Sequence, residues 1–149
     1  MALAATALLL GAVAVFWPRP ALVIRDDSGS ALRVIPLRGP LTLRLEYLHS
    51  VERTPVLEHY VAAAGGLRLV RMEFASQGAG LPTSGYVREG GRFVLHTDRW
   101  LPALSIRVSG TSRPRLVIND DVLDLLALVG DGGGLHLQVR RRFGIVLRR

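Results

Sequence analysis

The sequence predicts a mainly β protein: an antiparallel β-sandwich or barrel with one short helix, preceded by an N-terminal hydrophobic helix. Apolar residues fall mostly in short runs separated by glycine, proline, aspartate and serine, which is typical of strands joined by turns. Paired glycines mark two tight turns, and only one stretch after the N-terminal segment has helical character. A doubly wound α/β fold is not expected, because it would need helices between the strands.

The composition narrows the possible functions. The chain has 149 residues, which suits a single domain. Cysteine and lysine are both absent, which excludes disulfides, thiolate nucleophiles, a Schiff-base lysine and a P-loop lysine. The net charge of +7 comes from arginines spread along the whole chain, without a nucleic-acid-binding motif. We therefore expect no nucleic-acid partner and no cofactor.

The N-terminal segment directs the chain to a membrane. Residues 2–17 carry no charge and lack the polar face of a soluble core helix, although a membrane span needs about 20 apolar residues. We predict a signal anchor or signal peptide over 1–20 and a single β-rich periplasmic domain over 21–149. An A-x-A pattern at 12–14 allows cleavage and secretion. Trp17 resembles an interfacial anchor, which favours tethering to the inner membrane. The arginines that follow argue for the opposite orientation.

The first half of the chain predicts strands at 21–24, 31–37, 41–49, 55–63 and 67–74. In the third of these strands, leucine, tyrosine and histidine at odd positions alternate mainly with polar residues, as in a half-buried strand. Gly65 and Gly66 provide the turn before the fifth strand. The apolar residues of that strand change from odd to even positions, which indicates a β-bulge near Leu69.

The second half predicts a hairpin over 86–96, further strands at 101–109, 113–119 and 135–142, and a helix over 119–130. Gly90 and Gly91 form the tip of the hairpin. Asn119 or Asp120 can cap the helix, acidic residues occupy its first turn, and Gly130 can end it.

The third and fourth strands are expected to form a hairpin that carries the candidate site. A turn centred between positions 52 and 53 places Tyr47 opposite Glu58 and His49 opposite Val56. Tyr47, His49, Glu58 and Tyr60 then share the buried face, where a carboxylate needs partners. Two interpretations stay open: the four side chains form a satisfied polar cluster, or they surround a ligand. A slip of one residue would move Glu58 to the other face.

Catalysis and metal binding are not expected at this hairpin. His49, Glu52, Glu58 and His59 offer suitable donors, but the two histidines face opposite ways and no H-E-x-x-H spacing is present. Ser50 follows His49 directly, and adjacent strand residues point apart, so the pair is not placed for proton transfer. We therefore predict a protein that is not an enzyme, and a site without metal.

The glycines of 76–85 form a second candidate feature. Gly78 and Gly80 allow positive φ and expose backbone N–H groups, which can form a nest that binds an anion. The simpler interpretation is an ordinary loop that ends at Pro82.

The strings "HSVERTPVLEHY" and "GAGLP" resemble the paired motifs of a family of small uncharacterised exported bacterial and archaeal proteins, a domain of unknown function. Genes of that family often neighbour those of TAXI-type TRAP transporters, the tripartite ATP-independent periplasmic carriers of organic acids. The resemblance implies export and a transport context, without an established activity. The positions that match the motifs are Tyr47, His49, Ser50, Val51, Glu52, Thr54, Pro55, Val56, Glu58, Tyr60, Gly78, Ala79, Gly80, Leu81 and Pro82.

We therefore expect a membrane-tethered periplasmic accessory protein of a TAXI-type TRAP transporter. It would bind the transporter membrane subunit, its substrate-binding protein or a small organic anion where the hairpin meets the glycine loop. Gly78 and Gly80 would offer backbone donors, His49 and Tyr60 would hydrogen-bond the ligand, and Glu52 and Glu58 would orient these donors or contact a partner's arginine. The residues expected to form the binding site are Tyr47, His49, Ser50, Glu52, Thr54, Glu58, Tyr60, Gly78 and Gly80. The alternatives are a structural β-domain without ligand and a metal-dependent hydrolase.

Overall fold

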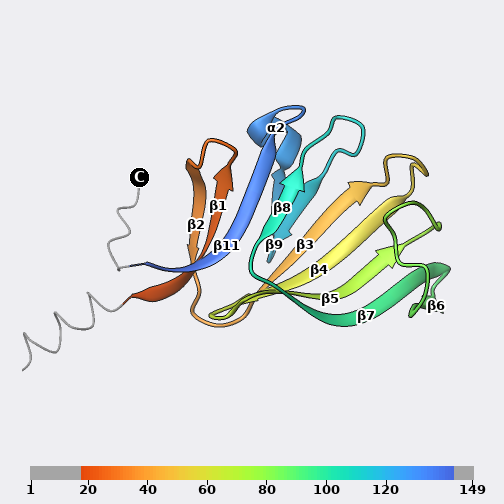
Figure 1. Cartoon of the computed structure of the whole chain (residues 1–149), viewed down its shortest axis with the longest axis horizontal. Helices are drawn as coiled ribbons and strands as arrows, with labels where there is room; N and C mark the ends of the chain where they lie inside the picture. The colour runs from red at the N-terminus through yellow and green to blue at the C-terminus, as the bar shows by residue number, and fades with distance from the viewer. Residues whose placement is uncertain (1–17, 143–149) are drawn as a thin grey trace, which may run out of the picture.

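The computed structural model describes residues 18–142, which form two antiparallel sheets and one short helix (Figure 1). All strand pairings in this range are antiparallel. The expectation of a mainly β fold with one short helix is confirmed. The hydrophobic segment expected over 2–17 lies outside the described residues. Within residues 18–142, no helix is long and apolar enough to cross a membrane.

The smaller sheet has four strands and joins the two ends of the described chain. Its order is β2 (Ala31–Pro36), β1 (Arg19–Asp26), β11 (Gly134–Arg142) and β8 (Leu104–Arg107). β1 pairs with β11 along its full length, so the first and last strands lie side by side (Figure 1).

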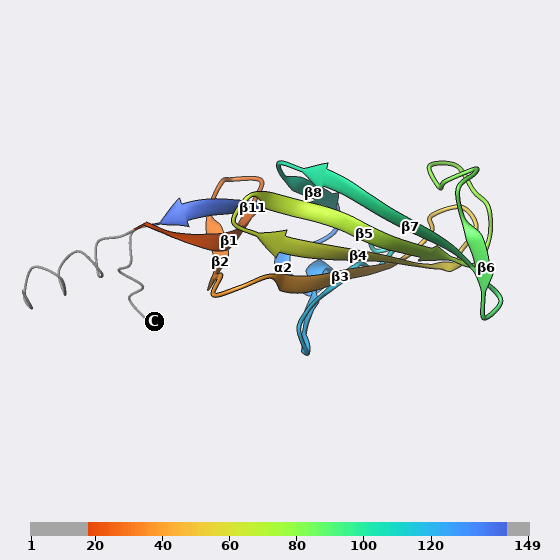
Figure 2. The same cartoon turned by 90° about the horizontal axis from the view of Figure 1, so that it is seen from below.

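The larger sheet has seven strands and carries the candidate site. Its order is β10 (Asp121–Asp124), β9 (Arg115–Ile118), β3 (Leu41–Leu48), β4 (Pro55–Ala63), β5 (Gly66–Phe74), β7 (Arg92–Leu101) and β6 (Val87–Glu89). Only two residues separate the end of β7 from β8, so the chain passes there from the larger sheet to the smaller one (Figure 2).

The main core lies between the two sheets. Leu22, Ile24, Leu135 and Leu137 of the smaller sheet are almost completely buried and belong to one apolar cluster with residues of β3, β4, β5 and β9. Alternate residues of these strands reach this cluster, and β1 and β9 also bury the residues between them, Val23 and Val117. A second cluster, centred on Phe74, fills the far end of the larger sheet under the 76–85 loop.

The β-bulge predicted near Leu69 is confirmed. Tyr60 pairs with Leu69 and His59 pairs with Arg71, so Val70 is left without a partner on β4. The extra residue shifts the alternation, and Leu69 and Met72 both reach the buried face although their positions differ in parity.

The helix predicted over 119–130 is wrong in its first half. Asn119 adopts a positive φ of 54° in a tight turn, and the following residues pair with β9 as β10. Helix α2 spans only Leu125–Val129, and Asp124 caps it by accepting hydrogen bonds from Leu126 N and Ala127 N. At residues 121–124, hydrogen bonding to β9 outweighs the local preference for a helix. The end at Gly130 is confirmed.

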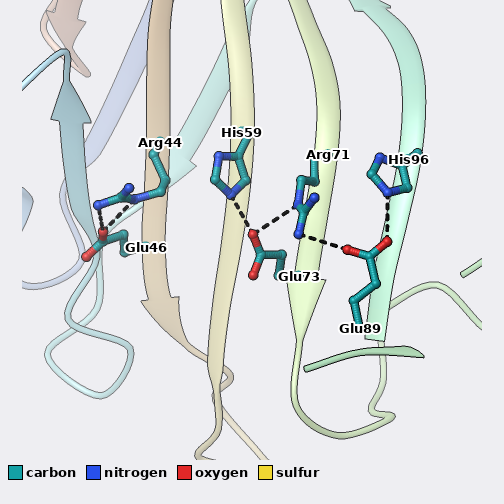
Figure 3. Close-up of polar contacts among 7 residues, drawn as sticks. All are labelled: Arg44, Glu46, His59, Arg71, Glu73, Glu89 and His96. Atoms are coloured by element: carbon teal, nitrogen blue, oxygen red, sulfur yellow. Dashed lines mark hydrogen bonds and ion pairs between the residues drawn. The ribbon is translucent and has the colours of Figure 1, made fainter. Parts of the chain in front are cut away.

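The outer face of the larger sheet is covered by paired charges (Figure 3). Glu73 accepts from both His59 and Arg71, at 3.0 and 3.1 Å. Arg71 also reaches Glu89 on β6, which in turn contacts His96 of β7. Glu46 lies between Arg44 and Arg115 and forms ion pairs with both. Glu46, Glu73 and Glu89 therefore each have at least one arginine or histidine partner on the same or a neighbouring strand.

A polar network ties the β1–β2 turn to β8 and β11. Asp27 accepts hydrogen bonds from Arg107 at 2.9 Å and from His136 Nε2 at 3.1 Å. The other ring nitrogen of His136 contacts Ser105 Oγ at 3.0 Å. Gly134 permits the approach of Asp27, because a Cβ at that position would lie 2.3 Å from Asp27 Oδ1.

Asp27→Asn should lower the free energy of unfolding in neutral solution and have little effect in strong acid. The hydrogen bond from His136, followed by the charge of Arg107, holds the pKa of Asp27 below its ordinary value of 3.8. A carboxyl group with a lowered folded-state pKa stabilises the fold above its unfolded-state pKa. This stabilisation is lost as the pH falls through the folded-state pKa. Urea unfolding at about pH 6 and about pH 2 measures the difference.

Asp120→Asn is the matched control for this measurement, because Asp120 is an exposed turn residue outside the network. Its effect should be small and equal at both pH values. A loss of stability in Asp27→Asn that is as large in strong acid as in neutral solution would contradict the prediction.

Candidate functional site

The β3–β4 hairpin has a register that differs by two residues from the predicted one. Leu45 pairs with Glu58 and Tyr47 pairs with Val56, so the predicted pairs Tyr47–Glu58 and His49–Val56 are wrong. The reason is the turn: His49 N donates to Thr54 O at 2.8 Å, which closes a loop of four residues centred between positions 51 and 52 rather than between 52 and 53. A shift of two residues preserves the faces, so Tyr47, Glu58 and Tyr60 still point to the inner side.

Glu58 lies between two phenols on this inner face. Tyr47 donates its hydroxyl to Glu58 Oε1 at 3.0 Å, and Tyr60 donates to the other carboxylate oxygen. Burial raises the pKa of both tyrosines above the range in which phenols usually titrate, and the negative charge of Glu58 raises it further. Both phenols therefore stay protonated and donate to the carboxylate. The polar cluster expected from the sequence contains these three side chains.

His49 lies outside that cluster and joins the hairpin to the 76–85 loop. Its side chain is buried, with 6% of its surface exposed. Glu52 N donates to Nδ1 at 3.1 Å, which leaves the hydrogen on Nε2, and Nε2 donates to Ala79 O at 3.0 Å. Both ring nitrogens are therefore used within the protein.

The two glycines of the loop have different structural roles. Gly78 packs directly on the imidazole, and a Cβ at this position would lie 2.9 Å from His49 Cε1. Gly80 has a positive φ of 85°, with open space around it, and lines the pocket described below. Close packing against His49 thus explains why position 78 requires glycine, and the positive φ explains why position 80 favours glycine.

The remaining predicted site residues lie around the turn. Thr54 Oγ1 contacts Ser76 Oγ at 2.7 Å, which forms a second link between hairpin and loop. Ser50 is exposed and lines the pocket. Glu52 is exposed, and its side chain packs beside Gly78. The structure thus separates the predicted residues into a hairpin–loop junction and the Glu58 cluster.

A pocket of about 590 Å³ lies between the two sheets and includes the Glu58 cluster. Its wall from the larger sheet includes Tyr47, Glu58 and Tyr60, and its wall from the smaller sheet includes Ser105 and Arg107. Leucine, isoleucine and methionine residues from both sheets also line it. The volume falls within the range of about 300–1,000 Å³ that is usual for small-molecule sites.

Arg99 of β7 also lines this pocket and was not predicted from the sequence. It pairs with Leu69, which in turn pairs with Tyr60, so the three residues share the inner face. Its positive charge opposes the rise in the pKa of Tyr60. This placement depends on β5, because its bulge determines which residues of β4 line up with which residues of β7. The sequence alone does not display that alignment.

The network around Asp27 was also missed, because its members lie far apart in the sequence. Ser105, His136 and Asp27 follow one another in the order of a hydrolase triad. Here Arg107 shares the carboxylate, and the side chains of His136 and Asp27 are 46% and 47% exposed. We interpret the network as a tie between strands. Among residues 18–142, no group of three or more His, Cys, Asp or Glu side chains is placed to hold a metal ion.

Gly78→Ala should lower the free energy of unfolding by about 1–3 kcal/mol, the usual cost of overpacking. The added methyl group would overlap His49 and also Glu52, whose Cγ would lie 2.9 Å away. Chemical unfolding of the variant and the native chain measures this difference.

Gly39→Ala is the control, because a Cβ there meets nothing within 4 Å and the φ of Gly39 lies outside the left-handed region. In a His49→Ala background, Gly78→Ala should cost less, because the main overlapping group is gone. Equal losses for Gly78→Ala and Gly39→Ala would show that the contact with His49 does not limit position 78.

Comparison with known protein families matches residues 43–125 to a domain of unknown function, DUF1850. Comparisons with curated proteins and with solved structures gave no significant match. The matched span begins in β3 and ends at the start of α2, so it includes the hairpin, the 76–85 loop and Arg99. Since this match covers more than half of the sequence, the chain belongs to the DUF1850 family.

Proposed function

We propose that this protein binds a small organic anion in the pocket between its sheets, as a membrane-tethered periplasmic accessory of a TAXI-type TRAP transporter. The observation that carries the binding proposal is the pocket of about 590 Å³ with an arginine and an acidic cluster on one wall. Small-molecule sites combine apolar side chains with a few polar groups that orient the ligand, and this pocket contains both kinds of residue.

Arg99 is the group best suited to bind the anion. It belongs to the pocket wall, and it forms no ion pair with an acid among the described residues. Arg107, by contrast, already binds Asp27 and the carbonyl of Gly132. A guanidinium without an ionic partner, next to apolar surface, favours a carboxylate ligand through paired hydrogen bonds.

The transport context rests on the sequence. The paired motifs in the hairpin and the 76–85 loop resemble those of proteins encoded beside TRAP transporters, which carry organic acids. The uncharged segment 2–17 supports placement at the membrane. The hairpin tip offers a contact for a transporter component, because Val51 is 70% exposed although it is apolar.

One observation favours the alternative of a structural β-domain without ligand. His49 uses both ring nitrogens in bonds that hold the hairpin to the loop, so its residue type is explained without a ligand. The same argument does not extend to Arg99, which has no such partner within residues 18–142.

Small organic carboxylates should raise the melting temperature of the full chain purified in detergent, and Arg99→Met should abolish this rise. Removal of the guanidinium removes the cation that binds the carboxylate. Arg38→Met is the charge-matched control, because Arg38 is exposed and does not line the pocket. Thermal unfolding with a panel of mono- and dicarboxylates measures both effects. If no carboxylate shifts the melting temperature, the binding proposal fails.

The accessory role has a separate test. The full chain, expressed with a TAXI-type transporter from the same genome, should co-purify from membranes with the membrane subunit or with the substrate-binding protein. Val51→Asp should reduce this recovery while leaving the carboxylate response unchanged. Absence of every transporter component from the purified membranes would contradict the accessory role, whatever the result with carboxylates.

A further inference from the structure

We infer that the ligand of the pocket is bipolar: a small amino carboxylate whose ammonium group binds Glu58 and whose carboxylate binds Arg99. This inference rests on the proposed function and specifies the class of ligand for that site. It follows from the placement of one negative and one positive side chain on the same pocket wall.

Glu58 differs from the acids on the other face of its sheet. Glu46 and Glu73 of the outer face each have arginine partners. Glu58 faces inward, and among the described residues its only hydrogen-bond donors are the two phenols. The phenols stabilise the carboxylate but leave its negative charge without a cation. A half-buried carboxylate in a pocket favours a cationic ligand group.

The hydrogen bonds define what this end of the pocket accepts. Tyr47 and Tyr60 direct their hydroxyl hydrogens to Glu58, so they have none to donate to a ligand. A carboxylate uses about four lone-pair sites, and the phenols occupy one on each oxygen. The Glu58 end therefore offers acceptors and negative charge. It suits an ammonium group and repels a carboxylate.

Arg99 provides the opposite polarity. Glu58 on β4 and Arg99 on β7 are separated by β5, and no ion pair joins them in the described structure. Neighbouring strands lie about 4.8 Å apart, so β4 and β7 are about 10 Å apart. Arg99 lies in line with Tyr60, two residues along β4 from Glu58, so the two charged residues are also offset along the strands. Leu69 and Met72 of β5 line the pocket between them. A ligand with two charged ends and a short hydrocarbon middle matches this arrangement.

Binding of three matched probes to the full chain in detergent tests the inference: 5-aminopentanoate, pentanoate and pentylamine. A second set, leucine with 4-methylpentanoate and isopentylamine, places the charges closer together. Isothermal titration should show that one amino carboxylate binds at least about tenfold more tightly than its matched carboxylate and amine, as expected for an added charge-assisted hydrogen bond.

Substitutions of Glu58 and Arg99 test which side chain binds which end of the ligand. Glu58→Gln keeps the shape of the side chain and should weaken amino carboxylate binding about tenfold without weakening binding of the plain carboxylate. Arg99→Met should weaken both carboxylate-containing ligands. Glu46→Gln, an acid on the outer face of the hairpin, should change neither. Circular dichroism confirms folding, and Glu58→Asp replaces Glu58→Gln if the latter does not fold.

The outcomes separate the two proposals. Equal affinities for pentanoate and 5-aminopentanoate, and likewise in the leucine set, with no effect of Glu58→Gln, would overturn the bipolar ligand and leave the anion site standing. Binding of the amines alone, unaffected by Arg99→Met, would overturn both. Absence of binding by every probe and by the carboxylate panel would overturn the proposed function itself.

Discussion

The hydrogen bond between His49 and Thr54 fixes the register of the central hairpin, and the pocket depends on that register. Side chains of a strand alternate between two faces, so a slip of one residue would exchange the inner and outer sets. With this turn, Glu58 points inward between two phenols. His49 also holds the hairpin against the 76–85 loop through Ala79, so the same residue defines the register and positions the loop.

The larger sheet distributes its charged residues between its outer and inner faces in a way that stability alone does not require. Outer-face acids form ion pairs across strands, and such pairs at a solvated surface contribute about 0–1 kcal/mol each (Figure 3). The pocket wall of the larger sheet holds Glu58 and Arg99, and no ion pair joins them in the described structure. Glu58 is half-buried and has no cationic partner among the described residues, so we connect its charge, and that of the more exposed Arg99, with ligand recognition.

The bulge at Val70 gives β5 a central role in assembling this wall. It lets apolar residues at odd positions before it and at even positions after it reach the same face. It also sets which residues of β4 lie in line with which residues of β7. The short passage from β7 to β8 then brings the smaller sheet against the pocket, where Ser105 and Arg107 form the opposing wall. The site is therefore a product of both sheets, although its charged wall belongs to the larger one.

Local patterns in the sequence were sufficient to predict most strands, the hairpin tip at Gly90 and Gly91, the bulge, and the inward direction of Tyr47, Glu58 and Tyr60. Alternation, glycine and proline act over a few neighbouring residues, so a single sequence displays them. The length of the hairpin loop, the conversion of 121–124 into a strand, and the position of Arg99 in line with Tyr60 depend on hydrogen bonds between distant segments. Only the tertiary structure decided these features, because strand pairing is long-range and leaves no local periodicity of its own.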